Sequence, residues 1–285
     1  MDLLQNAVPV AMLVFVLSSM LSMGLGLTVG QIIGPLRNLR LVALSLMANL
    51  VLMPLAAVAL TRLLRLDVPF GVGLLVLGTA AGAPFLPKLA QIAKGDLAFA
   101  VGLMVLLMVV TVGYMPLVLP VLLPGVSVNP AKIASSLFLL MLLPLAGALV
   151  VKAKRPVFAA RVKPFFDQGS NLGLIALIAL QVVVNFASVI SVIGTRAILA
   201  GVLFIAIGFV IGQLLGGPAA DTRAVLGLGT AQRNIAAALV VGSQSFSDPK
   251  VVVMVVVIAV VSLVTLMPLA RWLSKQSPLA AAARA

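Results

Sequence analysis

An arginine lies in the middle of an apolar run that is long enough to cross a membrane. The run covers residues 224–245 and is interrupted at 231–234 by the sequence AQRN. An arginine at the centre of a spanning helix costs about 3 kcal/mol on insertion scales, so it indicates a functional site with a partner. We predict that Arg233 binds an anion there. The neighbouring polar residues Thr230, Gln232 and Asn234 complete this part of the candidate site.

A second interrupted run lies in the first half of the chain. Residues 79–91 contain Pro84, Phe85 and Lys88 between apolar stretches. One Gly- or Pro-interrupted span in each half is the pattern of a transporter whose substrate binds between two broken helices. We therefore add these three residues to the candidate substrate site, together with the mid-span amides Asn49 and Asn185.

Each of these residues also has a structural interpretation. Arg233 can cap carbonyl groups freed at a helix break, because irregular backbone is tolerated at membrane depth only where protein buries it or it lines a cavity. Lys88 lies six residues before Lys94, so its long side chain can extend to the membrane surface. Asn49 and Asn185 can form hydrogen bonds between helices. The sequence leaves these alternatives open.

The residue types that most enzymes need are missing. The chain has no histidine and no cysteine, which excludes histidine-based acid–base catalysis, disulfides and thiolate or imidazole metal sites. The six acidic residues lie in loops or at span ends, which excludes proton coupling through an intramembrane carboxylate. We therefore expect no enzyme and no catalytic residue. Sodium is the one ion left open, and Asn49 and Asn234 are its candidate side-chain ligands.

The composition is that of an all-α polytopic membrane protein. Hydrophobic residues make up 63% of the chain and charged residues 9%, and the mean hydropathy is +1.29, far outside the range of soluble domains. The net charge of +13 comes from basic residues at the ends of apolar runs, where they orient the chain in the bilayer. The expected partners are therefore the lipid bilayer and a small organic anion, and not nucleic acid. The oligomeric state does not follow from the sequence.

At about 20 apolar residues per crossing, we place nine transmembrane helices, at 7–29, 41–60, 68–93, 97–123, 133–151, 171–193, 197–217, 224–245 and 251–272. Residues 1–123 form a first half with the broken span 68–93, and residues 124–285 form a second half with the broken span 224–245. No soluble domain fits between the spans.

The loop charges predict the orientation of the chain. Twelve Lys and Arg residues lie on one side of the predicted membrane and five on the other. Because basic loops stay in the cytoplasm, we expect the amino terminus outside and the carboxyl terminus in the cytoplasm. The expected location is the inner (plasma) membrane of the cell. The two broken spans then run in opposite directions. This is what inverted-topology repeats require, so we expect the broken helices to cross at the midplane.

Four ordered stretches resemble landmarks of the bile acid:sodium symporter family. They are SMGLGLT at 22–28, ANLVLMPLA at 48–56, AAGAPFLPKLAQIAKGDLAFAVGLM at 80–104 and GTAQRNIAAAL at 229–239. The resemblance implies a core domain, where the broken helices cross, that rocks against a panel domain. It also implies organic anions as substrates, such as bile acids, sulfated steroids and small carboxylates, usually driven by sodium. Nine spans resemble the shorter form of the family, which lacks the first helix of the first repeat.

The chain departs from the family pattern at the sodium sites. The positions of the family's ligands hold Leu86, Pro87, Ala100, Met104, Gly229 and Arg233, and Asn49 stands where a glutamine is common. Our hypothesis is that Arg233, together with Lys88, provides a fixed positive charge that replaces the positive charge of the sodium ion bound by relatives.

The sequence thus predicts secondary-active or facilitative transport of an organic anion by alternating access, with weak or no sodium dependence. The alternatives are an ordinary sodium-coupled symporter, a carrier of a related crossed-helix fold such as the auxin efflux carriers, and a channel.

Overall fold

A computed structural model describes residues 2–123, 129–184, 186, 192 and 194–276 of the chain. All regular elements in these residues are helical. Seven of the described helical stretches are long and apolar enough to cross a membrane: Asn6–Gly26, Leu39–Leu63, Leu97–Leu122, Pro130–Lys154, Ala197–Leu215, Ala220–Ser245 and Pro249–Lys275. The chain is therefore a multi-pass membrane protein, as its composition predicts.

The helices in chain order are α1 (Asp2–Gly26), α2 (Val29–Ile33), α3 (Leu39–Leu46), α4 (Met53–Leu63), α5 (Val68–Thr79), α6 (Leu86–Ala93), α7 (Leu97–Leu122), α8 (Pro130–Leu137), α9 (Leu143–Lys154), α10 (Pro156–Val184), α12 (Ala197–Leu215), α13 (Ala220–Ala231), α14 (Ile235–Ser245) and α15 (Pro249–Gln276). Short π-helical turns, Met47–Leu52 and Phe138–Leu142, join α3 to α4 and α8 to α9. Of the other two expected spans, the one at 68–93 is divided between α5 and α6, and the one at 171–193 falls on α10 and the residues after it.

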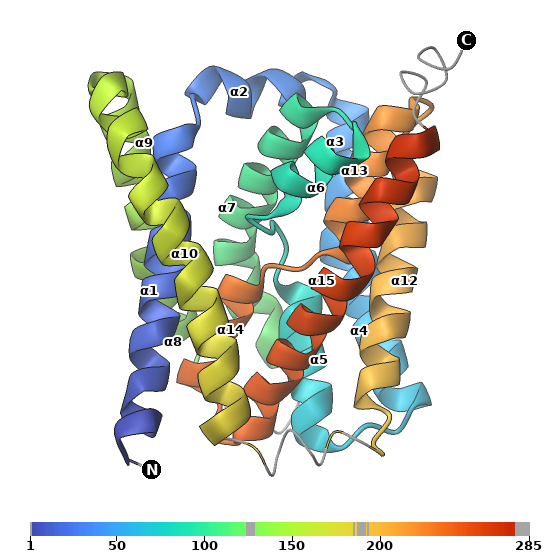
Figure 1. The fold of residues 1–285 in the computed structure, drawn as a ribbon. Helices are drawn as coiled ribbons and strands as arrows, with labels where there is room; N and C mark the ends of the chain where they lie inside the picture. Colours follow the sequence, from blue (N-terminus) through green and yellow to red (C-terminus); the bar gives the residue numbers. More distant parts are fainter. Residues whose placement is uncertain (1, 124–128, 185, 187–191, 193, 277–285) are drawn as a thin grey trace.

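The helices form two groups that lie beside each other (Figure 1). We call α1, α8, α9 and α10 the panel helices, because α1 packs along both α9 and α10. The core helices are α3–α7 and α12–α15, in which α12 packs on α13 and α15 packs on α5 and α6. The two broken pairs, α5–α6 and α13–α14, belong to the core group, and α14 borders the panel helices α1 and α8. Apolar burial therefore holds the segments that carry the candidate site.

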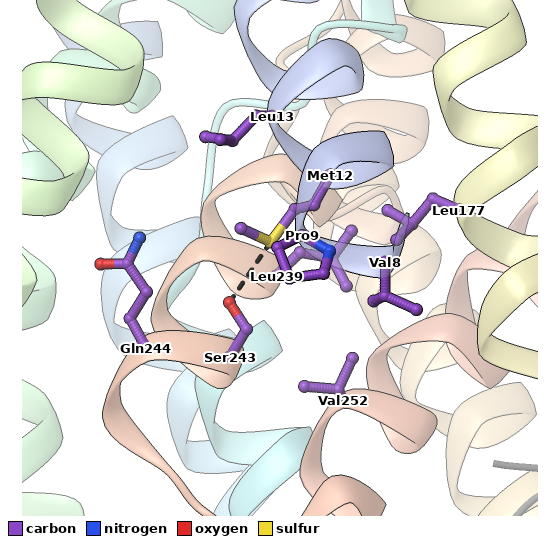
Figure 2. Close-up of a pocket in the computed structure, with 9 residues that line it drawn as sticks. All are labelled: Val8, Pro9, Met12, Leu13, Leu177, Leu239, Ser243, Gln244 and Val252. Carbon is purple, nitrogen blue, oxygen red and sulfur yellow. Dashed lines mark hydrogen bonds between the residues drawn. The ribbon is translucent and has the colours of Figure 1, made fainter. Parts of the chain in front are cut away.

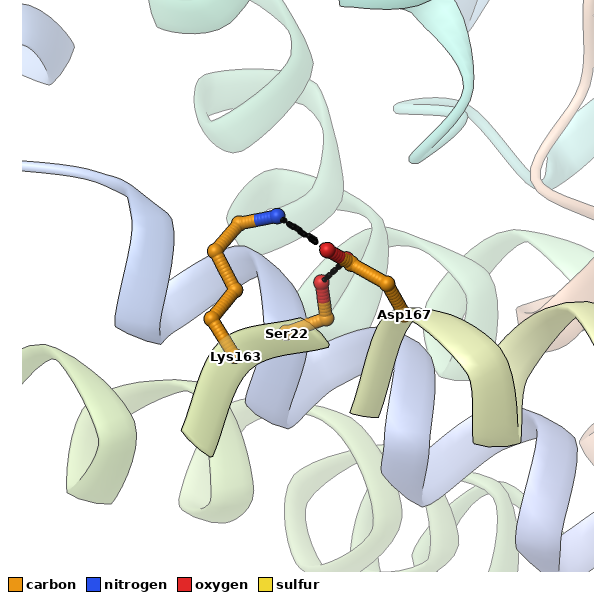
Figure 3. Close-up of polar contacts among 3 residues, drawn as sticks. All are labelled: Ser22, Lys163 and Asp167. Atoms are coloured by element: carbon orange, nitrogen blue, oxygen red, sulfur yellow. Dashed lines mark hydrogen bonds and ion pairs between the residues drawn. The ribbon is translucent and has the colours of Figure 1, made fainter. Parts of the chain in front are cut away.

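A polar layer joins α1 to α10 inside the panel group (Figure 3). The Asp167 carboxylate accepts hydrogen bonds from the Ser22 hydroxyl and from Lys163 Nζ at 2.7 Å, and the hydroxyl oxygens of Ser19 and Ser170 lie 2.6 Å apart. Burial alone would raise the pKa of the Asp167 carboxyl, but the hydrogen bonds from Lys163 and Ser22 outweigh burial and hold the pKa below its usual value. Asp167 precedes the expected span 171–193, so this layer ties the panel helices together near one membrane surface.

Candidate functional site

The two helix breaks predicted from the sequence are present and touch each other. Helix α5 ends at Thr79 and α6 begins at Leu86, while α13 ends at Ala231 and α14 begins at Ile235. The Asn234 N–H donates to the Ala80 carbonyl at 2.9 Å, and Asn234 Nδ2 donates to the Gly82 carbonyl at 2.9 Å. One residue of the second break thus supplies two hydrogen bonds to the backbone of the first.

Local sequence explains why both segments leave the helical path. Gly82 has φ +80°, and a Cβ atom there would lie 2.3 Å from the backbone nitrogen of Met108, so only glycine fits this position. Thr111 on α7 holds the unwound chain, because its hydroxyl oxygen accepts from the Ala81 N–H at 3.1 Å. In the second break, Asn234 Oδ1 accepts from the Ala237 N–H at 3.0 Å and caps the first turn of α14.

A proline creates further free carbonyl groups beside the breaks. Pro54 has no N–H to donate along the helix, and the chain before it forms a π-helical turn in which the Met53 N–H donates to the Ala48 carbonyl. The carbonyls of Asn49 and Leu50 therefore lose their usual helical donors. The Leu50 carbonyl accepts from the Tyr114 hydroxyl of α7 instead.

Arg233 binds the carbonyl groups that these irregular segments leave free. Its side chain is only 1% exposed. Nε donates to the Leu77 carbonyl at 3.0 Å, and Nη2 donates to the carbonyls of Gly78 at 2.8 Å and Asn49 at 3.3 Å. Nη1 donates to Asn49 Oδ1 at 2.8 Å. Arg233 therefore makes the contacts that we predicted for a residue that caps free carbonyl groups at a helix break.

The charge of Arg233 is stabilised by dipoles. Leu77 and Gly78 belong to the last turn of α5, where the helix dipole is negative. Among the residues that the structure describes, the one ion pair joins Lys163 to Asp167, so Arg233 has no carboxylate partner there. The positive charge of Arg233 is therefore surrounded by backbone carbonyl oxygens and the Asn49 side-chain oxygen, which bind it but carry no negative charge.

The structure brings some of the predicted site residues together and leaves others apart. Asn49 is fully buried beside Arg233, and its Nδ2 donates to the Thr230 hydroxyl at 3.2 Å. Pro84 and Phe85 lie half-buried in the link between α5 and α6. Lys88 is exposed on α6, where its Nζ donates to Gln91 Oε1 at 3.3 Å. The predicted residue Asn185 lies outside the described residues.

The two side-chain oxygens predicted as sodium ligands already accept hydrogen bonds. Asn49 Oδ1 accepts from Arg233, and Asn234 Oδ1 accepts from Ala237. At Gly229, where relatives have an acid according to the resemblance, a Cβ atom would lie 2.9 Å from Leu86 Cδ2, so apolar packing fills the space that a carboxylate would need. No group of three or more His, Cys, Asp or Glu residues gathers in the part of the chain that the structure describes. The amide oxygens of Asn49 and Asn234 therefore have hydrogen-bond donors where a separately bound sodium ion was predicted.

An apolar cavity of about 250 Å³ lies between panel and core helices (Figure 2). It is lined by Val8, Pro9, Met12, Leu13 and Leu177 from the panel and by Leu239, Ser243, Gln244 and Val252 from the core. Two polar contacts cross the same seam: the Ser243 hydroxyl donates to Met12 Sδ at 3.3 Å, and the Ser136 hydroxyl of α8 donates to Gln244 Oε1. The two groups of helices therefore contact each other beyond the break, at the end of α14.

Two residues of the site were missed by the sequence analysis. Tyr114 and Thr111 lie on α7 and bind free backbone of the π-helical turn and of the first break. Tyr114 could have been noticed, because it is the one tyrosine of the chain and lies inside an apolar run. Nothing in the sequence marked Thr111.

Comparison with known proteins identifies the family. The family model described as Sodium Bile acid symporter family matches residues 12–194, which is more than half of the 285 residues. The match includes the first break and ends before the second. A search of curated proteins finds no match. The chain belongs to the sodium bile acid symporter family.

Proposed function

We propose that the chain transports a small organic anion across the cell membrane by alternating access, with the fixed charge of Arg233 in place of a bound sodium ion. Family membership supports a transporter of a small solute and not an enzyme. The proposal adds an anionic substrate, independence from sodium and alternating access. Its main support is the set of four hydrogen bonds from Arg233 to oxygens at the end of α5 and in the π-helical turn before Pro54.

The position of the guanidinium supports sodium independence. In transporters with discontinuous helices, unwound carbonyls and the carboxyl ends of half-helices coordinate sodium. Here the last carbonyls of α5 and the freed carbonyl of Asn49 point at Arg233. A second cation about 5 Å from the guanidinium would be repelled by roughly 3 kcal/mol at an effective dielectric of about 20. The Arg233 guanidinium therefore acts as a tethered cation: it takes the place of the sodium ion and cannot be released with the substrate.

The same charge favours an anionic substrate. The described acidic residues lie outside the break region, so the full charge nearest to a substrate bound there is the buried positive charge of Arg233. Half-helix amino termini also favour negative groups in broken-helix transporters, and α6 and α14 both begin at the breaks. We propose that the anion binds where these termini meet, at the midplane of a membrane with the amino terminus of the chain outside.

Transport into vesicles of purified protein tests this proposal. Small carboxylates, sulfonates and taurocholate are first screened by thermal shift, and uptake of a stabilising anion is then measured in sodium and in potassium buffer. We expect saturable uptake at equal rates in both buffers. Uptake that collapses in potassium would show an ordinary sodium symporter, with ions on carbonyls and amides, and would refute the tethered-cation proposal.

The movement of core against panel can be tested with cysteines, because the natural chain has none. In the double variant Ser136→Cys/Gln244→Cys, a short thiol-specific cross-linker would lock α14 of the core to α8 of the panel, because the Ser136 hydroxyl reaches the end of the Gln244 side chain. We expect a methanethiosulfonate cross-linker to stop uptake and a reducing agent to restore it. The matched control is Ser19→Cys/Ser170→Cys, which joins α1 and α10 within the panel. Uptake that persists in the fully cross-linked Ser136/Gln244 pair would contradict alternating access at this seam.

A further inference from the structure

One polar atom at the meeting point of the two breaks has no partner. Gln232 lies between the end of α13 and Arg233, its side chain is 8% exposed, and its Oε1 atom is buried without a hydrogen bond. The other polar side chains there are satisfied: Arg233 binds four oxygens. Asn49 binds the side chains of Arg233 and Thr230 and a backbone carbonyl, and Asn234 binds the backbone of Gly82 and Ala237. Buried polar groups are seldom left unpaired, and the exceptions call for a missing partner.

The chemistry of an amide oxygen limits what this partner can be. An amide oxygen accepts hydrogen bonds and cannot donate them, so it cannot bind the carboxylate or sulfonate of an anion, which are acceptors too. A free metal ion is disfavoured because the meeting point of the breaks already holds the fixed positive charge of Arg233, the next residue in the chain. The partner that fits is a neutral O–H or N–H group.

We propose that Gln232 Oε1 accepts a hydrogen bond from a hydroxyl or amide N–H group of the transported anion. This inference rests on the proposed function and narrows its substrate class to anions that carry a hydrogen-bond donor near the charged group. A site with a buried acceptor rejects an analogue that lacks the donor, because the acceptor then stays unpaired. Gln232 is accordingly a residue that determines specificity for hydroxylated or amide-bearing anions over their hydrogen-substituted analogues.

Matched anion pairs test the proposal on the full chain. The pairs are lactate and propionate, isethionate and ethanesulfonate, and cholate and its hydroxyl-free parent cholanate. Binding is measured by thermal shift of the purified protein over a concentration series. In at least one pair we expect the hydroxylated member to bind about tenfold more tightly, as one added hydrogen bond allows.

The variants Gln232→Leu and Gln232→Met should remove this preference. Both should fold at least as well as the natural chain without ligand, because each removes an unpaired buried atom. The control is Gln213→Leu on α12: the Nε2 atom of Gln213 is also buried without a partner, but it lies against Gly227 in the seam between α12 and α13. This control should keep the preference for hydroxylated anions.

The outcomes separate this inference from the proposed function. If anions bind and both members of every pair bind equally, or if Gln232→Leu keeps the preference, the role of Gln232 is refuted while anion transport stands. If no anion in the set stabilises the protein, the proposed function fails and this inference fails with it.

Discussion

Replacing Arg233 by glutamine removes the fixed cation and leaves a neutral amide that can fill part of its space. Four oxygens, on Leu77, Gly78 and Asn49, lose a charged donor. At about 1.5 kcal/mol for each bond to a charged group, the loss is about 6 kcal/mol. The neutral side chain returns about 3 kcal/mol of the cost of placing an arginine in the membrane interior. We expect Arg233→Gln to be less stable by about 3 kcal/mol, or on the order of 6 °C in melting temperature.

The variant should also acquire a response to sodium. Without the guanidinium, the carbonyls at the end of α5 and the Asn49 oxygens are free to coordinate an ion, as unwound carbonyls do in sodium-coupled transporters. Sodium at ten times its dissociation constant would restore about 1.4 kcal/mol, which corresponds to about 3 °C. The natural chain should melt at the same temperature in sodium and in potassium.

The assay is the melting temperature of purified protein in matched sodium and potassium chloride. Arg161→Gln is the control, because it removes an exposed arginine from α10 without touching the breaks. A natural chain that melts higher in sodium would contradict the tethered-cation proposal. An Arg233→Gln variant that is as stable as the natural chain, and indifferent to the ion, would show that the bonds of Arg233 hold nothing together.

Two further predictions concern packing and pH. A Cβ atom at Gly212 on α12 would lie 2.3 Å from the Leu226 carbonyl oxygen of α13, so Gly212→Ala should destabilise the protein by about 2 kcal/mol. In the control Gly147→Ala on α9, the new Cβ atom meets nothing within 4 Å. This control should leave the melting temperature unchanged in the same thermal denaturation. The lowered pKa of Asp167 means that its ion pair with Lys163 stabilises the fold above the ordinary carboxyl pKa of about 4 and is lost as the pH falls below it. The Asp167→Asn variant should therefore melt slightly below the natural chain at pH 7; the difference is small because the Lys163 and Asp167 side chains are 37% and 42% exposed. Equal melting curves at pH 7 would contradict this role.

The sequence predicted the helical membrane architecture and the positions of both breaks, because these follow from local composition. Arg233 and Asn234 marked the second break, and Pro84 marked the first, in runs that otherwise satisfy the length of a membrane crossing. The family followed from the order of short landmarks and is confirmed by the family match.

The partners of Arg233 could not be read from the sequence. Three of the four oxygens that it binds are backbone carbonyls, and every residue has a carbonyl, so no residue type marks them. The π-helical turn before Pro54 frees one of these carbonyls, and its contact with residue 233 joins positions 184 residues apart. The exposure of Lys88 depends on which face of α6 turns outward, and composition alone leaves that open. The roles of the candidate residues in binding substrate stay predictions.

The bond between Arg233 and Gly78 also has a consequence for biogenesis. The two residues are 155 positions apart in the chain, so at 5–20 residues per second the ribosome needs roughly 8–30 s to make the second after the first. Throughout that interval the exposed carbonyls at the end of α5 lack their final donor. Until the later segment is made, these carbonyls depend on water or on the insertion machinery for their hydrogen bonds.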